Sequence, residues 1–163
     1  MTASTAAAPA FNAQRAIDLA HETFDTEAAA IQGLKARVGQ GFTRAVEAIL
    51  QIPGRVVVMG MGKSGHVGRK IAATLASTGT PAMFVHPGEA SHGDLGMVTT
   101  SDLVLMISNS GESQEVAAIL PVLKRLGIPL VAMTGNSQST MALHATLWID
   151  TAVSTEACPL NLA

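Results

Sequence analysis

The sequence predicts an α/β domain with a doubly wound, five-stranded parallel sheet in three layers, preceded by a pair of helices. From Arg55 onward, short and continuously apolar runs alternate with helical patterns. Continuous apolarity is typical of parallel strands that are covered on both faces. We expect strands near 55–59, 82–85, 102–107, 129–133 and 146–149, and helices near 64–78, 113–126 and 138–144.

The N-terminal region has a helical period instead. Apolar residues recur every three or four positions from Ala13 to Val38, and the stripe resumes at Phe42 and closes at Pro53-Gly54. We expect a flexible tail over 1–10 and one domain over 11–163, because this length suits a single core. The two stripes exceed what the sheet needs for cover, so a homo-oligomer is expected.

Composition narrows the class of protein. A net charge of −2 and 3% aromatic residues provide neither a basic stripe nor stacking platforms, so nucleic acid is not an expected partner. No apolar run approaches the roughly 20 residues of a membrane-spanning helix. The N-terminus lacks the pattern of a secretory signal, and the single cysteine, Cys158, fits a reducing compartment. A soluble cytoplasmic protein without a membrane partner is expected.

A lysine stands where the first strand of the sheet gives way to a helix. Lys63 lies in the glycine-rich segment 60–68, although the positive end of a helix disfavours a cation. A second loop, Ser108–Ser113, follows another predicted strand. In a flavodoxin-like strand order 2-1-3-4-5, both loops face one crevice at the switch point of the sheet. We therefore expect one shared anion site.

The identity of the anion can be narrowed from the same loops. Gly60, Gly62 and Gly65 fit a dinucleotide fingerprint, but His86 stands where the ribose-binding acid belongs. A P-loop would need glycine at the position of Val57. Clustered hydroxyls at a helix N-terminus instead make a metal-free cradle for a small phosphate monoester, although each serine alone could be a helix cap. The serines concerned are Ser108, Ser110 and Ser113.

Other polar residues have two interpretations from position alone. Glu115 in a first helical turn favours the helix dipole whatever its chemistry, and Glu156 would pass as a solvated acid. His86 and His92 could hold a metal with Asp94, but hydrogen-bonding histidines are commoner than ligands at such spacing.

Five segments together closely resemble the D-arabinose 5-phosphate isomerase family of sugar isomerase (SIS) domain enzymes. They are 56–66, 86–90, 92–98, 108–113 and 156–160. The resemblance implies interconversion of D-ribulose 5-phosphate and D-arabinose 5-phosphate for the Kdo sugar of lipopolysaccharide, a tetramer, and no organic cofactor. It implies Lys63, Glu115 and Glu156 as catalytic residues, and His86 as a site of inhibitory zinc. The implied substrate contacts are Ser64, Gly79, Thr80, His86, His92, Ser108, Asn109, Ser110 and Ser113.

Isomerisation needs a proton carrier and a group that stabilises an enediolate. We expect Glu156 to carry the proton and Lys63 to stabilise the negative charge, with Glu115 orienting Lys63 or assisting ring opening. The alternatives are a non-catalytic module that binds sugar phosphates and an isomerase of another phosphosugar. Full-length members of the family continue into a Ser-His-Pro-Gly-Gly segment and two cystathionine-β-synthase modules. We therefore expect a truncated domain that binds sugar phosphate but isomerises it poorly.

Overall fold

The computed structural model describes residues 10–158. The contacts of the chain divide it into two compact units. The larger unit comprises Leu34–Val153, and the smaller unit combines residues up to Gly33 with residues from Ser154 onward. Each unit is described by itself below. The prediction of one domain over 11–163 stays a prediction, and the predicted tail over 1–10 lies outside the described residues except for Ala10.

The larger unit is built on the predicted parallel sheet. All neighbouring strands are parallel, and their order is β2-β1-β3-β4-β5, as the sequence predicted. The strands are β1 (Val56–Gly60), β2 (Ala82–Val85), β3 (Leu103–Ile107), β4 (Leu130–Thr134) and β5 (Leu147–Asp150).

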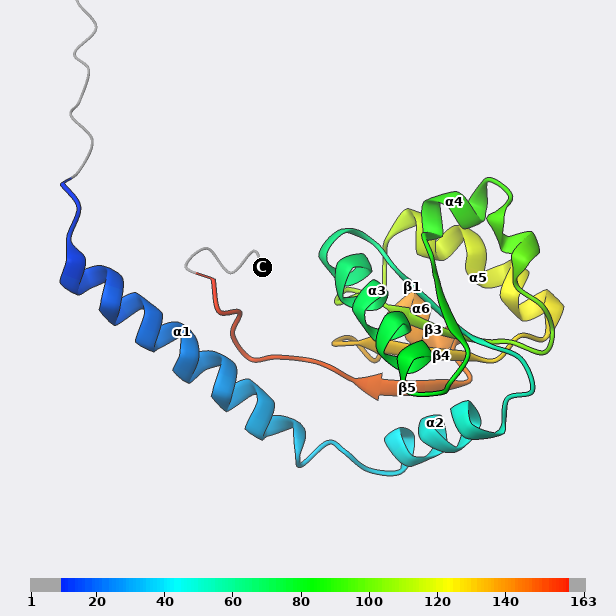
Figure 1. Cartoon of the computed structure of the whole chain (residues 1–163), viewed down its shortest axis with the longest axis horizontal. Helices are drawn as coiled ribbons and strands as arrows, with labels where there is room; N and C mark the ends of the chain where they lie inside the picture. Colours follow the sequence, from blue (N-terminus) through cyan, green and yellow to red (C-terminus); the bar gives the residue numbers. More distant parts are fainter. Residues whose placement is uncertain (1–9, 159–163) are drawn as a thin grey trace, which may run out of the picture. The chain divides into compact units, whose positions relative to one another are not determined.

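Helices cover both faces of this sheet and make three layers (Figure 1). Alternate residues of a strand point to opposite faces. Thus Val56 and Val58 belong to one core cluster, while Val57 and Met59 belong to the other. The first cluster packs under α2 (Gln40–Gln51) and α3 (Gly62–Ser77). The second packs under α4 (Pro87–Ser91), α5 (Gln114–Leu126) and α6 (Thr140–His144).

Local signals at both ends define α5, the helix that follows the serine loop. Ser113 is its N-cap, and the Ser113 Oγ accepts a hydrogen bond from the Val116 amide at 3.3 Å. Gly127 ends the helix in a left-handed conformation with φ of 68°, which glycine adopts without the steric cost of a Cβ. The sequence signals therefore place the start of α5 directly after the serine loop.

At the amino end of the sheet, Asp102 ties the starts of β1 and β3 together. The residue is 1% exposed, and its carboxylate accepts hydrogen bonds from the Arg55 amide at 2.7 Å and the Thr99 amide at 2.8 Å. The Thr99 hydroxyl donates a further bond at 3.0 Å. Burial raises the pKa of the Asp102 carboxyl, but the bonds from Thr99 and Arg55 outweigh burial and hold that pKa below its ordinary value.

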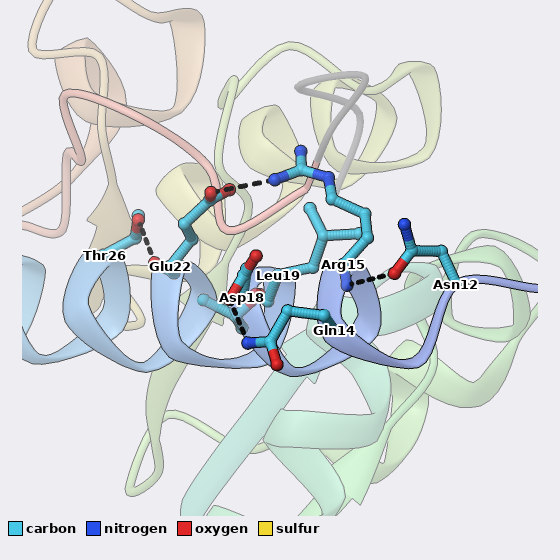
Figure 2. Close-up of polar contacts among 8 residues, drawn as sticks. Asn12, Gln14, Arg15, Asp18, Leu19, Glu22 and Thr26 are labelled. Atoms are coloured by element: carbon cyan, nitrogen blue, oxygen red, sulfur yellow. Dashed lines mark hydrogen bonds and ion pairs between the residues drawn. The ribbon is translucent and has the colours of Figure 1, made fainter.

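In the smaller unit, α1 (Ala13–Leu34) begins at an asparagine cap (Figure 2). The Asn12 side chain accepts a hydrogen bond from the Arg15 amide at 3.0 Å, and Arg15 also pairs with Glu22 at 3.1 Å. The predicted apolar stripe continues to Val38, whereas the helix ends at Leu34. The Leu34 carbonyl accepts bonds from the amides of Arg37 and Val38, so the chain turns there. No helix within residues 10–158 is long and apolar enough to span a bilayer.

Candidate functional site

Three loops lie side by side at the carboxyl end of the sheet. Strand β1 pairs with β2 and with β3, and the register places Met59 opposite Val85 and Gly60 opposite Ile107. The segments that follow these strands therefore leave the sheet at neighbouring points. They carry most of the residues predicted for the site, which are Lys63, Ser64, His86, His92, Ser108, Asn109, Ser110, Ser113 and Glu115.

The turn from β1 into α3 is shaped by close contact between backbone atoms. A Cβ on Gly60 would lie 2.9 Å from the Ser64 carbonyl oxygen, and one on Gly65 would lie 2.6 Å from the Gly60 oxygen. Only glycine fits at these two positions without movement of the helix. The glycines that suggested a nucleotide fingerprint thus have a structural role. Their packing places Lys63, which is exposed, and Ser64 in the first turn of α3.

The serine loop has hydroxyl groups whose oxygens already accept hydrogen bonds from the backbone. Ser108 Oγ accepts from the Gly111 amide at 3.1 Å, and Ser110 Oγ accepts from the Glu112 amide at 3.3 Å. Ser113 Oγ accepts from Val116 as the cap of α5. A hydroxyl that accepts a bond in this way keeps its own hydrogen to donate. The loop can therefore present three O–H donors to an anion.

The first turn of α5 contributes backbone donors as well. The first amides of a helix have no intrahelical acceptor. Within the described part of the chain, no acceptor bonds to the amides of Gln114 and Glu115. Donors of this kind at a helix N-terminus favour phosphate binding.

The serine loop is fixed from behind by the segment between β4 and α6. The Asn109 carbonyl accepts bonds from the Thr134 hydroxyl at 2.9 Å and the Gly135 amide at 3.1 Å. The Glu112 carboxylate accepts from the Thr140 amide at 2.6 Å and the Thr140 hydroxyl at 2.8 Å. These bonds lower the pKa of the Glu112 carboxyl below its ordinary value.

Sequence reasoning missed the supporting residues Glu112, Thr134 and Thr140. Glu112 lies within the motif that drew attention to the serines, but Thr140 is 28 positions away along the chain. No local spacing signals a contact over that separation. Only the adjacency of β3 and β4, which the predicted strand order contained, could have suggested that their following loops touch.

His86 caps a short helix that the sequence did not predict. Its Nδ1 accepts a hydrogen bond from the Gly88 amide at 3.2 Å, and Pro87 occupies the first turn of α4. In a neutral ring the proton then lies on Nε2. His92 is the exposed C-cap of the same helix. Within residues 10–158 no three side chains of histidine, cysteine, aspartate or glutamate gather as a metal-binding group.

Gly79 and Thr80 lie at the other end of the sheet. They precede β2, whose first residue Ala82 pairs with Val56 at the start of β1. A strand of four residues separates them from the β2–α4 loop, a span of roughly 13 Å. Gly79, with φ of 98°, directly follows Thr78, the C-cap of α3, and the Thr80 amide donates to the Leu75 carbonyl at 2.9 Å. The larger unit does not bring these two residues to the serine loop.

Glu156 belongs to the smaller unit and is half-buried. It lines a cavity of about 330 Å³ with Ala157, Cys158 and one side of α1. Figure 2 shows several of the α1 residues concerned, and those lining the cavity are Arg15, Leu19, Glu22, Thr23 and Thr26. That Glu156 and Lys63 act on the same substrate stays a prediction.

A parallel α/β sheet with clustered hydroxyls and helix amides at its carboxyl end is an arrangement suited to phosphate binding. Residues 49–163 match the SIS domain, and the chain belongs to this family.

Two curated proteins are similar to this chain over most of its length. The chain is 58% identical over 147 residues to arabinose 5-phosphate isomerase KdsD of Pseudomonas aeruginosa and 54% identical over 155 residues to KdsD of Escherichia coli K12. These alignments cover 90% and 95% of this chain. They cover 45% and 46% of the relatives, so the chain spans about half the length of the curated proteins it matches.

A solved structure shares the fold closely. It is c3406 of E. coli CFT073 in complex with arabinose 5-phosphate, with a TM-score of 0.89 and 41% sequence identity. The match covers 94% of this chain and 81% of that one.

Proposed function

We propose that the chain is the SIS domain of an aldose-ketose isomerase that interconverts D-ribulose 5-phosphate and D-arabinose 5-phosphate. The observation that carries this proposal is 54–58% identity to two arabinose 5-phosphate isomerases over at least 90% of the chain. The related structure contains bound arabinose 5-phosphate, which supports the same substrate. We further propose that the product serves Kdo and lipopolysaccharide synthesis, as the name KdsD suggests.

The serine loop would hold the phosphate of the substrate. Its hydroxyls and the first amides of α5 supply neutral donors, and Lys63 supplies a positive charge from the first turn of α3. This donor set suits a small monoester, whose charge needs few cations for neutralisation. Phosphate binding would place the sugar carbons above the carboxyl ends of β1 and β3.

The chemical step moves a proton between two adjacent carbons of the opened sugar. We propose that the Glu156 carboxylate takes the proton from one carbon and returns it to the next. The Lys63 ammonium would stabilise the enediolate oxygen that carries the negative charge in between. Glu115, in the first turn of α5, would orient Lys63 or assist ring opening.

No organic cofactor is proposed, because proton transfer and charge stabilisation need none. Zinc is proposed only as an inhibitor that binds His86. With Nδ1 engaged by the Gly88 amide, Nε2 is the ring atom that zinc would take. Between residues 10 and 158 no three candidate ligands gather, and the closed site of a structural zinc has four.

We also propose a homotetramer in the cytoplasm. In support, no residue of α1 is buried, and Ile17, Phe24 and Ile31 recur every seven positions on one helix face. These three side chains are 50–65% exposed. A helix of this kind gains most of its stability from a partner that covers its apolar face.

Conversion of D-arabinose 5-phosphate, followed by NMR in deuterated water, tests the proposed function. A proton held on the Glu156 carboxylate can exchange with solvent before it is returned, so we expect some deuterium to enter the carbon next to the carbonyl. In Lys63→Ala we expect kcat to fall at least about 100-fold while KM changes less than about tenfold, because the lysine acts mainly on the intermediate. Lys70→Ala is the matched control, since Lys70 is also exposed and lies about two turns further along α3.

The assay is run on this chain and on a version lengthened to match its relatives. An equal loss in the Lys63 and Lys70 variants would contradict the role of Lys63. If neither version converts the sugar, the proposed activity is wrong.

A further inference from the structure

The serine loop contains an acid that opposes its proposed ligand. Glu112 stands between Ser110 and Ser113, and a carboxylate repels a phosphate at the same site. Hydrogen bonds from Thr140 lower the pKa of Glu112, so the side chain is charged at neutral pH. A negative charge in an anion-binding loop needs a reason other than contact with the anion.

The bonds of Glu112 supply such a reason. One carboxylate oxygen accepts the Thr140 amide and the other accepts the Thr140 hydroxyl, at 2.6 and 2.8 Å. Both oxygens are therefore engaged by the first residue of α6. We call this pair of bonds the Glu112–Thr140 clasp.

Two further contacts hold the same loop to the same segment. The Gly111 carbonyl accepts the Met141 amide at 3.2 Å, next to the clasp. A Cβ on Gly111 would collide with the side chain of the buried Ser139, the N-cap of α6, so the loop packs closely against the start of this helix. The loop thus rests on α6 through its backbone, and the clasp is the side-chain connection between them.

We propose that Glu112 is a positioning residue that holds the serine loop in its phosphate-binding conformation through Thr140. Ser110 Oγ is oriented by the Glu112 amide, and Ser113 follows Glu112 directly, so movement of Glu112 displaces both hydroxyls. The clasp also turns the carboxylate toward α6. The first turn of α6 therefore supports the proposed phosphate site without contributing a donor to the phosphate. This inference rests on the proposed function of the loop.

Binding of inorganic phosphate and of D-arabinose 5-phosphate to the full chain, measured by calorimetry, tests the clasp. We expect Glu112→Ala to weaken the binding of both ligands about tenfold, because hydroxyl donors that are displaced no longer bond to the phosphate in good geometry. Glu112→Gln keeps one acceptor oxygen and Thr140→Val keeps the amide, so each should weaken binding about threefold. Adding Thr140→Val to Glu112→Ala should cost nothing more, because the partner is already absent.

Two further readouts separate positioning from general stability. Amide exchange of residues 110–113 without ligand should quicken about tenfold in Glu112→Ala. In the conversion assay, KM should rise while kcat changes less than about twofold. Glu47→Ala is the matched control, because Glu47 is also an exposed acid whose carboxylate accepts a hydrogen bond, from Gln51 on α2.

The outcomes are distinguishable. If wild-type protein binds neither ligand, the proposed function of the loop fails, and the clasp proposal fails with it. If wild-type protein binds and Glu112→Ala binds equally well, the clasp alone is overturned, whatever the exchange shows. Equal weakening in the Glu47 control would likewise overturn a specific role for Glu112.

Discussion

The two ends of the sheet use the same chemical device for opposite purposes. At the amino end, Asp102 accepts the amide and hydroxyl of Thr99, and at the carboxyl end Glu112 accepts the amide and hydroxyl of Thr140. Asp102 is 1% exposed and Glu112 is exposed. Asp102 also accepts the Arg55 amide and pairs with the Arg55 guanidinium at 3.5 Å.

The two ends differ in whether their hydrogen-bond donors are engaged within the protein or remain able to bind a ligand. Around Asp102, the amides at the starts of β1 and β3 are engaged inside the protein. Around Glu112, the serine hydroxyls and the first amides of α5 still have hydrogens to give. Donors that are engaged within the protein, like those around Asp102, serve stability, whereas donors that remain, like those of the serine loop, are suited to a ligand. Substitutions at the two ends should therefore have different effects.

The largest effect on stability is expected from Asp102→Ala. This change leaves two amides and a hydroxyl without their acceptor in a buried place, so we expect a loss of about 3 kcal/mol in the free energy of unfolding. Denaturant titration measures it. Asp150→Ala is the comparison at the carboxyl end, where the carboxylate is half-buried and pairs with Arg37 at 3.1 Å. We expect about 1 kcal/mol there, and equal losses would break the distinction between the two ends.

A pair of glycine variants tests the close approach of the serine loop to α6. Gly111 and Gly127 have φ of 69° and 68°, so alanine costs about 1 kcal/mol at each from backbone strain. A Cβ on Gly111 would also collide with Ser139, whereas one on Gly127 meets nothing within 4 Å. We expect Gly111→Ala to cost about 2 kcal/mol more than Gly127→Ala. The midpoints of urea unfolding of the two variants measure this difference. Similar midpoints would show that the loop can move away from α6 without loss of stability.

The smallest expected effect is on the dependence of stability on pH in the acid range. Burial raises the pKa of Asp102, but its hydrogen bonds lower that pKa by more than burial raises it. The folded pKa therefore lies below the unfolded one. The stability that Asp102 contributes is then fully present above the unfolded pKa of about 4 and is lost as pH falls through the folded pKa. Asp102→Asn should have a flatter decline in stability below about pH 4 than the wild type. Parallel declines would assign the acid sensitivity to other carboxylates.

Much of the larger unit could be predicted from the sequence because its signals are local. Continuous apolar runs indicated the strands, and their alternation with helices indicated a parallel sheet covered on both faces. The flavodoxin-like strand order, which was assumed for such a sheet, then placed Lys63 and the serines at one end. The short helix α4 escaped prediction because Pro87-Gly88 is typical of a turn, whereas His86 caps a helix there. Its bond to Gly88 could not be distinguished in advance from a role as a metal ligand.

The contacts between distant segments could not be predicted. Thr140 supports Glu112 through two bonds that depend on how the loops after β3 and β4 fold toward each other. Gly79 and Thr80 entered the predicted site only through resemblance, and the larger unit places them at the amino end of the sheet. The predicted strand at 82–85 already implied the position of Gly79 and Thr80, because residues that precede a strand lie at its amino end. The bonds between Glu112 and Thr140 had no such signal, because sequence spacing describes neighbours along one element.

The close contact between Gly60 and Gly65 makes the position of the site independent of the side chains that fill the core. Because main-chain atoms meet there, the position of Lys63 depends on two missing side chains and not on which apolar residues fill the sheet. Val58 and Ala72 can therefore change in size together, as core residues do when total volume is kept, while the lysine stays in register. Stability and chemistry at this turn can diverge independently over evolutionary time.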